Sequence, residues 1–153
     1  MTIISLVADH QFCLCEFNVF LTDQSLEKNS CMNGRLDVNM THNSFKQSIL
    51  NKKKQIGIWC NIESPLVAEI LADAGFDWIV IDSEYGQNSV AELLTRHHAI
   101  AQYATESLIK LPNNDKVEIE KLVDVGVRNF LIPFVDSEHE AKEIVSFTRF
   151  PSR

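Results

Sequence analysis

Short apolar runs alternate with amphipathic segments four times after residue 40, and this alternation constrains the fold of the chain more than any other feature of its sequence. The apolar runs occupy residues 55–60, 76–82, 107–112 and 128–136. Parallel strands that are buried on both faces of a sheet have continuous apolar sequences of this kind, and each intervening helix serves as a crossover. The sequence therefore predicts an α/β fold with a parallel sheet.

The segments between the apolar runs carry the start and stop signals of helices. Ser64 is placed to cap a helix that has Pro65 at its first position, and Asp115 can cap another. Gly75 and Gly126 follow the last apolar positions of these two helices, where glycine commonly ends a helix. Helices are accordingly expected at 64–75, 88–104, 115–126 and 137–150, with a shorter one at 41–54 for which Ser44 is the expected N-cap.

The spacing of the repeated units favours half of a (β/α)8 barrel. The segments 71–82 and 122–136 share one pattern, in which the end of a predicted helix is followed by a glycine, a predicted strand and an acidic residue. Their glycines, Gly75 and Gly126, are 51 residues apart. Eight strand–helix units need roughly 200 residues or more, so about the first four units are present here. A four-stranded doubly wound sheet is the alternative. The chain contains neither GxGxxG nor GxxxxGK[ST], so it gives no support to dinucleotide or P-loop binding.

Residues 1–39 differ from the rest of the chain. They mix short apolar pieces with Asn, Asp and Ser and sustain neither a helical nor a strand period. We therefore expect residues 1–39 to be an irregular N-terminal extension outside the fold, which can be removed at little cost, and residues 40–153 to form the folded part.

Composition and charge exclude several classes of partner. A net charge of −7 and an isoelectric point near 5.2 disfavour binding to nucleic acid or to an anionic membrane. No apolar stretch is long enough to span a bilayer, and the N-terminus lacks the basic region of a secretory signal, so we expect a cytoplasmic protein. The cysteines at 13, 15, 31 and 60 are expected to be free thiols, and a zinc cluster of His10 with the first three is disfavoured by their spacing.

Polar side chains gather where the predicted strands end. Ligands of parallel α/β proteins bind beyond the carboxyl ends of the strands, so these side chains are candidates for a functional site. They are Trp59 and Asn61 at the end of the first strand, Asp82, Glu84 and Tyr85 following the second, and Lys110 and Asp115 at the end of the third and beyond it. The alternative is that Asp82 and Asp115 only cap turns or helices. His97 and His98 fall within a predicted helix and are expected to be surface or packing residues.

Residues 40–153 resemble the HpcH/HpaI aldolases, the class II pyruvate aldolases of the 4-hydroxy-2-oxoheptane-1,7-dioate aldolase type. The resemblance runs in order through NSFKQSI, QIGIW, AEILADAGFDWIVIDSEYG, NDKVEIEKLVDVG, LIPFVDSEHEA and TRFPSR. It implies a (β/α)8 TIM barrel, assembled as an oligomer, that reversibly cleaves a 4-hydroxy-2-oxo acid to pyruvate and an aldehyde. It also implies a divalent metal, Mg²⁺, Mn²⁺ or Co²⁺, that polarises the 2-oxo acid while a base moves the proton.

The same resemblance assigns roles to the polar residues. Asp82 and Asp115 would be orienting carboxylates, and Trp59 would line the substrate pocket. The family pattern Asp-x-Glu-His-Gly is changed here, since Tyr85 stands where the catalytic histidine is expected, and Lys110 replaces an arginine that grips the pyruvate end. Glu84 would serve the water shell of the metal or a turn.

The metal ligands of the family, a glutamate and an aspartate, are expected beyond Arg153. We therefore expect no metal ligands within this chain and no aldolase activity from the chain alone. The alternatives are a non-catalytic remnant or interaction partner that docks on an intact aldolase, and a small-molecule binding module. Unpaired strands of an open barrel also predict association through their edges.

Overall fold

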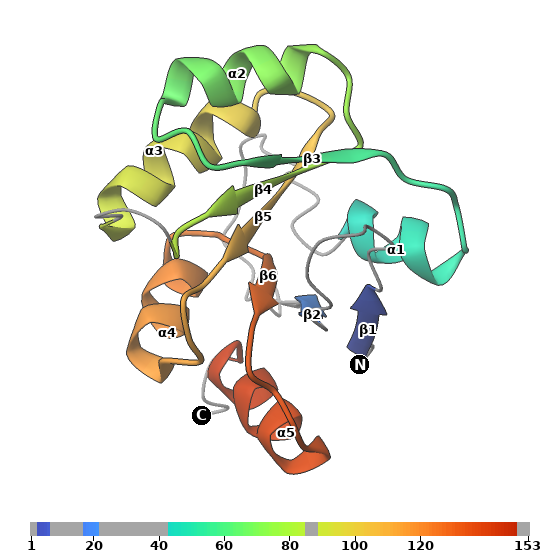
Figure 1. Cartoon of the computed structure of the whole chain (residues 1–153), viewed down its shortest axis with the longest axis vertical. Helices are drawn as coiled ribbons and strands as arrows, with labels where there is room; N and C mark the ends of the chain where they lie inside the picture. The colour runs from blue at the N-terminus through green and yellow to red at the C-terminus, as the bar shows by residue number, and fades with distance from the viewer. Residues whose placement is uncertain (1–2, 7–16, 22–42, 85–88, 150–153) are drawn as a thin grey trace, which may run out of the picture.

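The computed structural model describes residues 3–6, 17–21, 43–84 and 89–149. Strands and helices alternate regularly from residue 44 onward (Figure 1). The strands are β1 (Ile3–Leu6), β2 (Phe17–Leu21), β3 (Gly57–Cys60), β4 (Trp78–Asp82), β5 (Glu106–Lys110) and β6 (Asn129–Ile132). The helices are α1 (Ser44–Leu50), α2 (Pro65–Asp73), α3 (Val90–Ile100), α4 (Lys116–Asp124) and α5 (Glu138–Phe147).

All six strands belong to one sheet, in the order β1-β2-β6-β5-β4-β3. The four strands from β3 to β6 are parallel and lie side by side in chain order. Because each is connected to the next by a helix, this part of the chain is a run of strand–helix units of the predicted kind. The prediction of an alternating α/β fold with a parallel sheet is confirmed.

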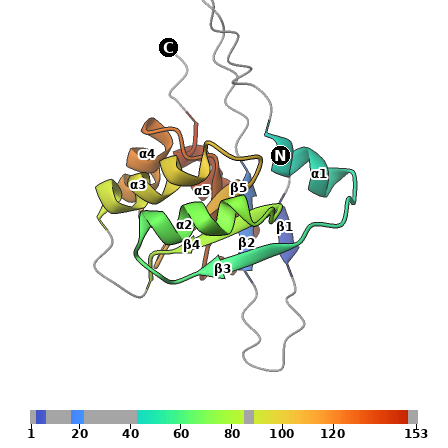
Figure 2. The ribbon, with the colours of Figure 1, turned by 90° about the horizontal axis from the view of Figure 1, so that it is seen from above.

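The two faces of the parallel strands bury different residues, because successive side chains of a strand point to opposite faces. One face packs against α2 to α5 and contributes Ile79, Ile81, Ile109, Phe130 and Ile132 to the larger hydrophobic core. Figures 1 and 2 show these helices gathered on one side of the sheet. The other face carries a smaller cluster of Val80, Leu108 and Leu131. We call this second face the inner face of the sheet.

Helix α1 covers part of the inner face. Its Phe45 is buried against the cluster of Val80, Leu108 and Leu131. Next to the helix, the Asn43 side chain donates from Nδ2 to Asn129 Oδ1 at 2.7 Å and accepts from the Lys46 backbone N–H, so it caps α1 and joins it to β6. The cap is therefore Asn43, one residue earlier than the predicted Ser44, whose hydroxyl donates to Glu106 on β5 instead.

The predicted boundaries of α2 and α4 agree with the structure, whereas α3 ends at Ile100 and α5 at Phe147, earlier than the predicted 104 and 150. Ser64 caps α2 with Pro65 at its start, and Asp115 caps α4. Gly75 and Gly126 follow α2 and α4 with φ of 85° and 100°, a left-handed conformation that glycine adopts without strain. These boundaries were predictable because each depends on a local signal.

The N-terminal segment differs from the expectation of an irregular extension. Strands β1 and β2 pair antiparallel with each other, and β2 pairs antiparallel with β6. The apolar pieces at 3–6 and 17–21 are too short to reveal a period in the sequence. They add to the sheet because β6 would otherwise present an unpaired edge.

Within the described ranges, no helix is long and apolar enough to cross a membrane. Cys60 is a buried free thiol, as expected. Cys13, Cys15, Cys31 and His10, the members of the disfavoured zinc cluster, lie outside the described residues.

His97 is a half-buried residue between α3 and β5. Its Nδ1 lies 2.6 Å from the hydroxyl oxygen of Ser107 on β5. Burial, helped by the charge of His98, lowers the pKa of His97 from 6.5 to about 4. The ring is therefore neutral in the folded protein at physiological pH, in keeping with the predicted packing role.

This depressed pKa predicts an acid-sensitive stability. Above pH 6.5 the His97 ring is neutral in both the folded and the unfolded chain, so it does not make the free energy of unfolding depend on pH. As the pH falls towards 4, only the unfolded chain takes up the proton, so the free energy of unfolding falls by up to about 3 kcal/mol. In urea unfolding across this pH range, the free energy of unfolding of His97→Gln should fall less with decreasing pH than that of the native chain. The matched variant is His98→Gln, on the exposed neighbour, and a slope as shallow as that of His97→Gln in this control would contradict the assignment.

Candidate functional site

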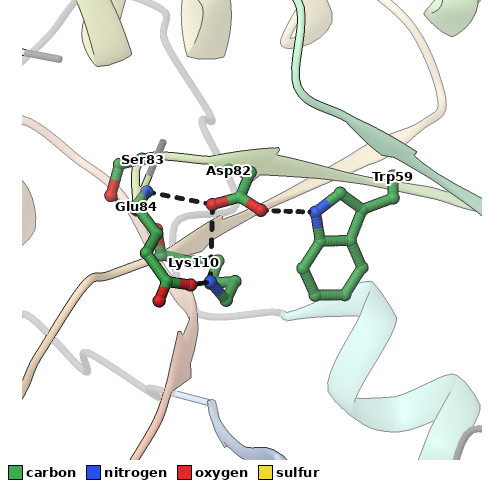
Figure 3. Close-up of polar contacts among 5 residues, drawn as sticks. All are labelled: Trp59, Asp82, Ser83, Glu84 and Lys110. Carbon is green, nitrogen blue, oxygen red and sulfur yellow. Dashed lines mark hydrogen bonds and ion pairs between the residues drawn. The ribbon is translucent and has the colours of Figure 1, made fainter. Parts of the chain in front are cut away.

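The candidate site lies on the inner face at the carboxyl end of the parallel strands. Strand β4 ends at Asp82 and β5 ends at Lys110, and the register of the two strands places these residues directly opposite each other. Trp59 lies on β3, one strand further along. Figure 3 shows Trp59, Asp82, Ser83, Glu84 and Lys110 together, and we call these five residues the strand-end cluster.

Asp82 is the centre of the strand-end cluster. Its carboxylate accepts from the Trp59 indole N–H at 2.7 Å through Oδ2, and from the Glu84 backbone N–H at 2.9 Å through Oδ1 (Figure 3). Lys110 Nζ lies 3.5 Å from the same Oδ1. The side chain is only 4% exposed. A carboxylate that is buried to this degree needs such partners, because an isolated charge would be expensive to remove from water.

Lys110 supplies the positive charge of the cluster. Its side chain is 3% exposed and pairs with both Asp82 and Glu84. The ammonium also lies 5.9 Å from the centre of the Trp59 ring, a geometry that adds a cation–π attraction. Two carboxylates therefore face one ammonium, and the cluster carries one net negative charge when all three groups are ionised.

Ser83 was not singled out from the sequence, although it ties the two strand ends together. Its hydroxyl donates to the Lys110 carbonyl oxygen at 2.6 Å, and its backbone N–H donates to the same oxygen at 3.1 Å. This double contact fixes the chain that carries Glu84 against the end of β5. The only signal in the sequence is a small polar residue between two acids, which is too common to identify such a role.

The remaining candidates are placed differently. Tyr85 lies outside the described residues. Asp115 is exposed at the start of α4, where Oδ1 accepts from the Glu118 backbone N–H at 2.8 Å. This contact matches the capping alternative that the sequence left open. Burial and the adjacent Asp115 carboxylate raise the pKa of Glu118. Asn61 is exposed beyond the end of β3.

These residues do not by themselves fit a divalent metal. The described part of the chain contains no group of three or more His, Cys, Asp or Glu side chains that could hold a metal ion. The two carboxylates of the strand-end cluster are already paired with a protein cation, Lys110. A metal would need further oxygen ligands.

Comparison with known proteins connects this arrangement with a family. The family model described as HpcH/HpaI aldolase/citrate lyase matches residues 55–153. A 4-hydroxy-2-oxo-heptane-1,7-dioate aldolase of Escherichia coli is 43% identical over 109 residues, which are 71% of this chain and 42% of that protein. A 5-keto-4-deoxy-D-glucarate aldolase of Escherichia coli is 38% identical over 109 residues, which are 43% of its length. The chain thus spans about two fifths of the length of these curated relatives.

The fold comparison gives the same result. The crystal structure of an HpcH/HpaI aldolase/citrate lyase family protein from Burkholderia cenocepacia matches with a TM-score of 0.68 and 31% sequence identity. The match covers 72% of this chain and 44% of that one. With the parallel order from β3 to β6, this likeness confirms the predicted fold class, a TIM barrel of which about the first four strand–helix units are present.

The pairing within the cluster predicts a large stability effect for one substitution. Lys110→Met removes the ammonium and leaves the buried Asp82 carboxylate without a cation, which should lower the free energy of unfolding by about 3 kcal/mol. Lys116→Met is the matched control, because Lys116 pairs with Glu120 at the surface and its loss should cost less than about 1 kcal/mol. Urea unfolding at neutral pH measures both. Equal, small losses would show that the charges of the cluster are not coupled.

Proposed function

Because this chain belongs to the HpcH/HpaI aldolase/citrate lyase family, we propose that it carries the first half of the active site of a pyruvate-type aldolase. The reaction is the reversible cleavage of a 4-hydroxy-2-oxo acid to pyruvate and an aldehyde. The 153-residue chain is proposed to be inactive alone and to need the second half of the barrel.

The observation that supports this proposal is the position of the strand-end cluster. Asp82, Lys110 and Trp59 come from three adjacent parallel strands and meet on the inner face at the carboxyl ends of those strands. This is the end of a barrel at which substrates bind. Removing the charges of Asp82 and Lys110 from water costs free energy, and apolar residues would fill the same space without that cost. This favours a role of the charges in binding an anion such as a 2-oxo acid.

The residues can be given roles in that reaction. Lys110 attracts the substrate carboxylate, and Glu84, the more exposed of its two partners, is the group that the substrate displaces. Asp82 keeps Lys110 and the Trp59 ring in position. Asp115 is proposed as a second orienting carboxylate, which requires its side chain to leave the cap of α4. Lysine holds a carboxylate less specifically than the arginine of the family, because it lacks the planar pair of donors.

Proton transfer is the step of the reaction for which this half-site is least suited. Cleavage of the bond between C3 and C4 requires a base to take the proton of the 4-hydroxyl group, while C3 gains a proton to give pyruvate. Tyr85 occupies the position of the base in the family pattern. A tyrosine with an ordinary pKa near 10 loses its proton at pH 7 at a cost of about 4 kcal/mol, so turnover should be slow even in a complete barrel.

A divalent metal is proposed for the complete barrel only, with ligands from the missing strands. It would supply Lewis-acid polarisation of the 2-oxo group.

A non-catalytic interaction partner is the second candidate, and one observation favours it. Ile62, in the loop after β3, and Leu66 and Ile70, on α2, are well exposed. Leu66 and Ile70 are four residues apart and so share one face of the helix, and exposed apolar surface can mark a protein interface. On this view the chain would associate with an intact aldolase or with another copy of itself.

Completion of the barrel tests the catalytic proposal. The full chain is fused after Arg153 to the C-terminal half of the Escherichia coli 4-hydroxy-2-oxo-heptane-1,7-dioate aldolase, and pyruvate release from a 4-hydroxy-2-oxo acid is followed with Mg²⁺, Mn²⁺ or Co²⁺ supplied. We expect no cleavage by the chain alone and weak cleavage by the fusion. Tyr85→His in the fusion should raise the rate by about one to three orders of magnitude, because a histidine is poised to accept a proton at neutral pH.

Tyr103→His is the matched control, since Tyr103 lies in the turn after α3 and donates to Glu69 rather than to the cluster. This variant should leave the rate of the fusion unchanged. A fusion that is indifferent to Tyr85→His would mean that the base lies elsewhere. Metal-dependent cleavage by the 153-residue chain alone would contradict the half-site proposal.

A further inference from the structure

The edge of β6 is the place where the parallel sheet could continue, and a strand from the N-terminal segment fills it. We infer that β2 is a built-in cap on this edge, which keeps β6 from pairing with β6 of a second copy of the chain. The inference concerns residues to which the aldolase proposal gives no role, and it is tested on the 153-residue chain. In a completed barrel, the next strand would take the place of β2 beside β6.

The register shows that β2 fits the edge along its whole length. Asn18, Val19, Phe20 and Leu21 stand opposite Ile132, Leu131, Phe130 and Asn129 in that order. The backbone pairing therefore covers all four residues of β6.

The same row of the sheet runs from the strand-end cluster to the cap. Asp82 is opposite Lys110, Lys110 is opposite Leu131, and Leu131 is opposite Val19. Figure 1 shows β2 and β1 following β6 at this end of the sheet. The cap is therefore two strands away from Lys110, and any strand that replaces it would enter the sheet at the same short distance from the candidate site.

A second copy is the occupant that an uncapped β6 would accept. All four residues of β6 are buried, so loss of β2 would leave an apolar strand with unpaired backbone groups. Two copies related by a two-fold axis would bring their β6 strands together antiparallel, the direction in which β2 now pairs. The two sequences are also alike, with Asn-Val-Phe-Leu at 18–21 and Asn-Phe-Leu-Ile at 129–132.

The cap moves the open edge outward from β6 to β1. Both strands have four residues, so the edge keeps its length. The two edges differ in their support: β6 pairs on its other side with the buried strand β5, whereas β1, among the described strands, pairs with β2 alone.

Hydrogen exchange of the full chain tests this inference. Val19→Pro removes a backbone donor from the middle of β2, and Val19→Thr keeps the strand propensity and is the matched control. In dilute Val19→Pro, the amides of Asn129–Ile132 that point towards β2 should exchange at least about tenfold faster than in the control. At about hundredfold higher concentration their protection should return, because second copies then pair through β6. The amides of β4 should be unchanged throughout.

Two results would overturn the inference. One is equal protection of β6 in Val19→Pro and Val19→Thr, and the other is a loss of protection that concentration does not restore. If Val19→Pro also exposes β4, the milder Val19→Gly is measured in the same way. Loss of β4 protection in both variants would show that β2 is part of the core of the fold and not a removable cap.

Discussion

The parallel strands of this protein must be buried on both faces, and the rest of the structure depends on how that burial is divided. Residues such as Ile79 and Ile81 face the helices, while the alternate residues face inward. Among the described residues, Phe45 and Ile49 of α1 pack on the inner face. At the carboxyl end of the strands the inward positions change from apolar residues to Asp82 and Lys110, so the period of two places the charged groups on the same face as the small cluster.

The charged residues at the buried strand ends are stabilised by one another. A buried lysine is tolerated at the end of β5 because two carboxylates surround it, and the aspartate is tolerated because an indole and a backbone N–H also bind it. The cluster is therefore held together by its own contacts before any substrate arrives. A 2-oxo acid would have to exchange with one of these carboxylates, and Glu84 is the partner more open to solvent.

The sequence predicted those features that depend on local signals. The parallel strands follow from continuous apolar runs, and the ends of α2 and α4 follow from Ser64, Asp115 and the two glycines. The pairing of β2 with β6 could not be predicted, because Leu21 and its partner Asn129 are far apart in the chain and the contact depends on an edge that exists only after folding. Asp82 and Lys110 stand at the ends of neighbouring strands, which indicated that they meet. Whether Asp115 caps α4 or belongs to a catalytic site depends on geometry that the sequence does not contain.

The central claim is that the strand-end cluster receives the carboxylate of a 2-oxo acid. The two tryptophans of the chain allow a direct measurement, because the indole N–H of Trp59 binds Asp82 inside the cluster, while Trp78 packs at the other end of β4. In a titration of the ¹⁵N-labelled full chain with pyruvate, followed by NMR, we expect the Trp59 indole signal to shift and saturate and the Trp78 signal to shift much less. In Lys110→Arg, the shift of the Trp59 signal should be only partly lost. Equal shifts of both signals, or a Trp59 signal that pyruvate leaves unmoved, would contradict the central claim.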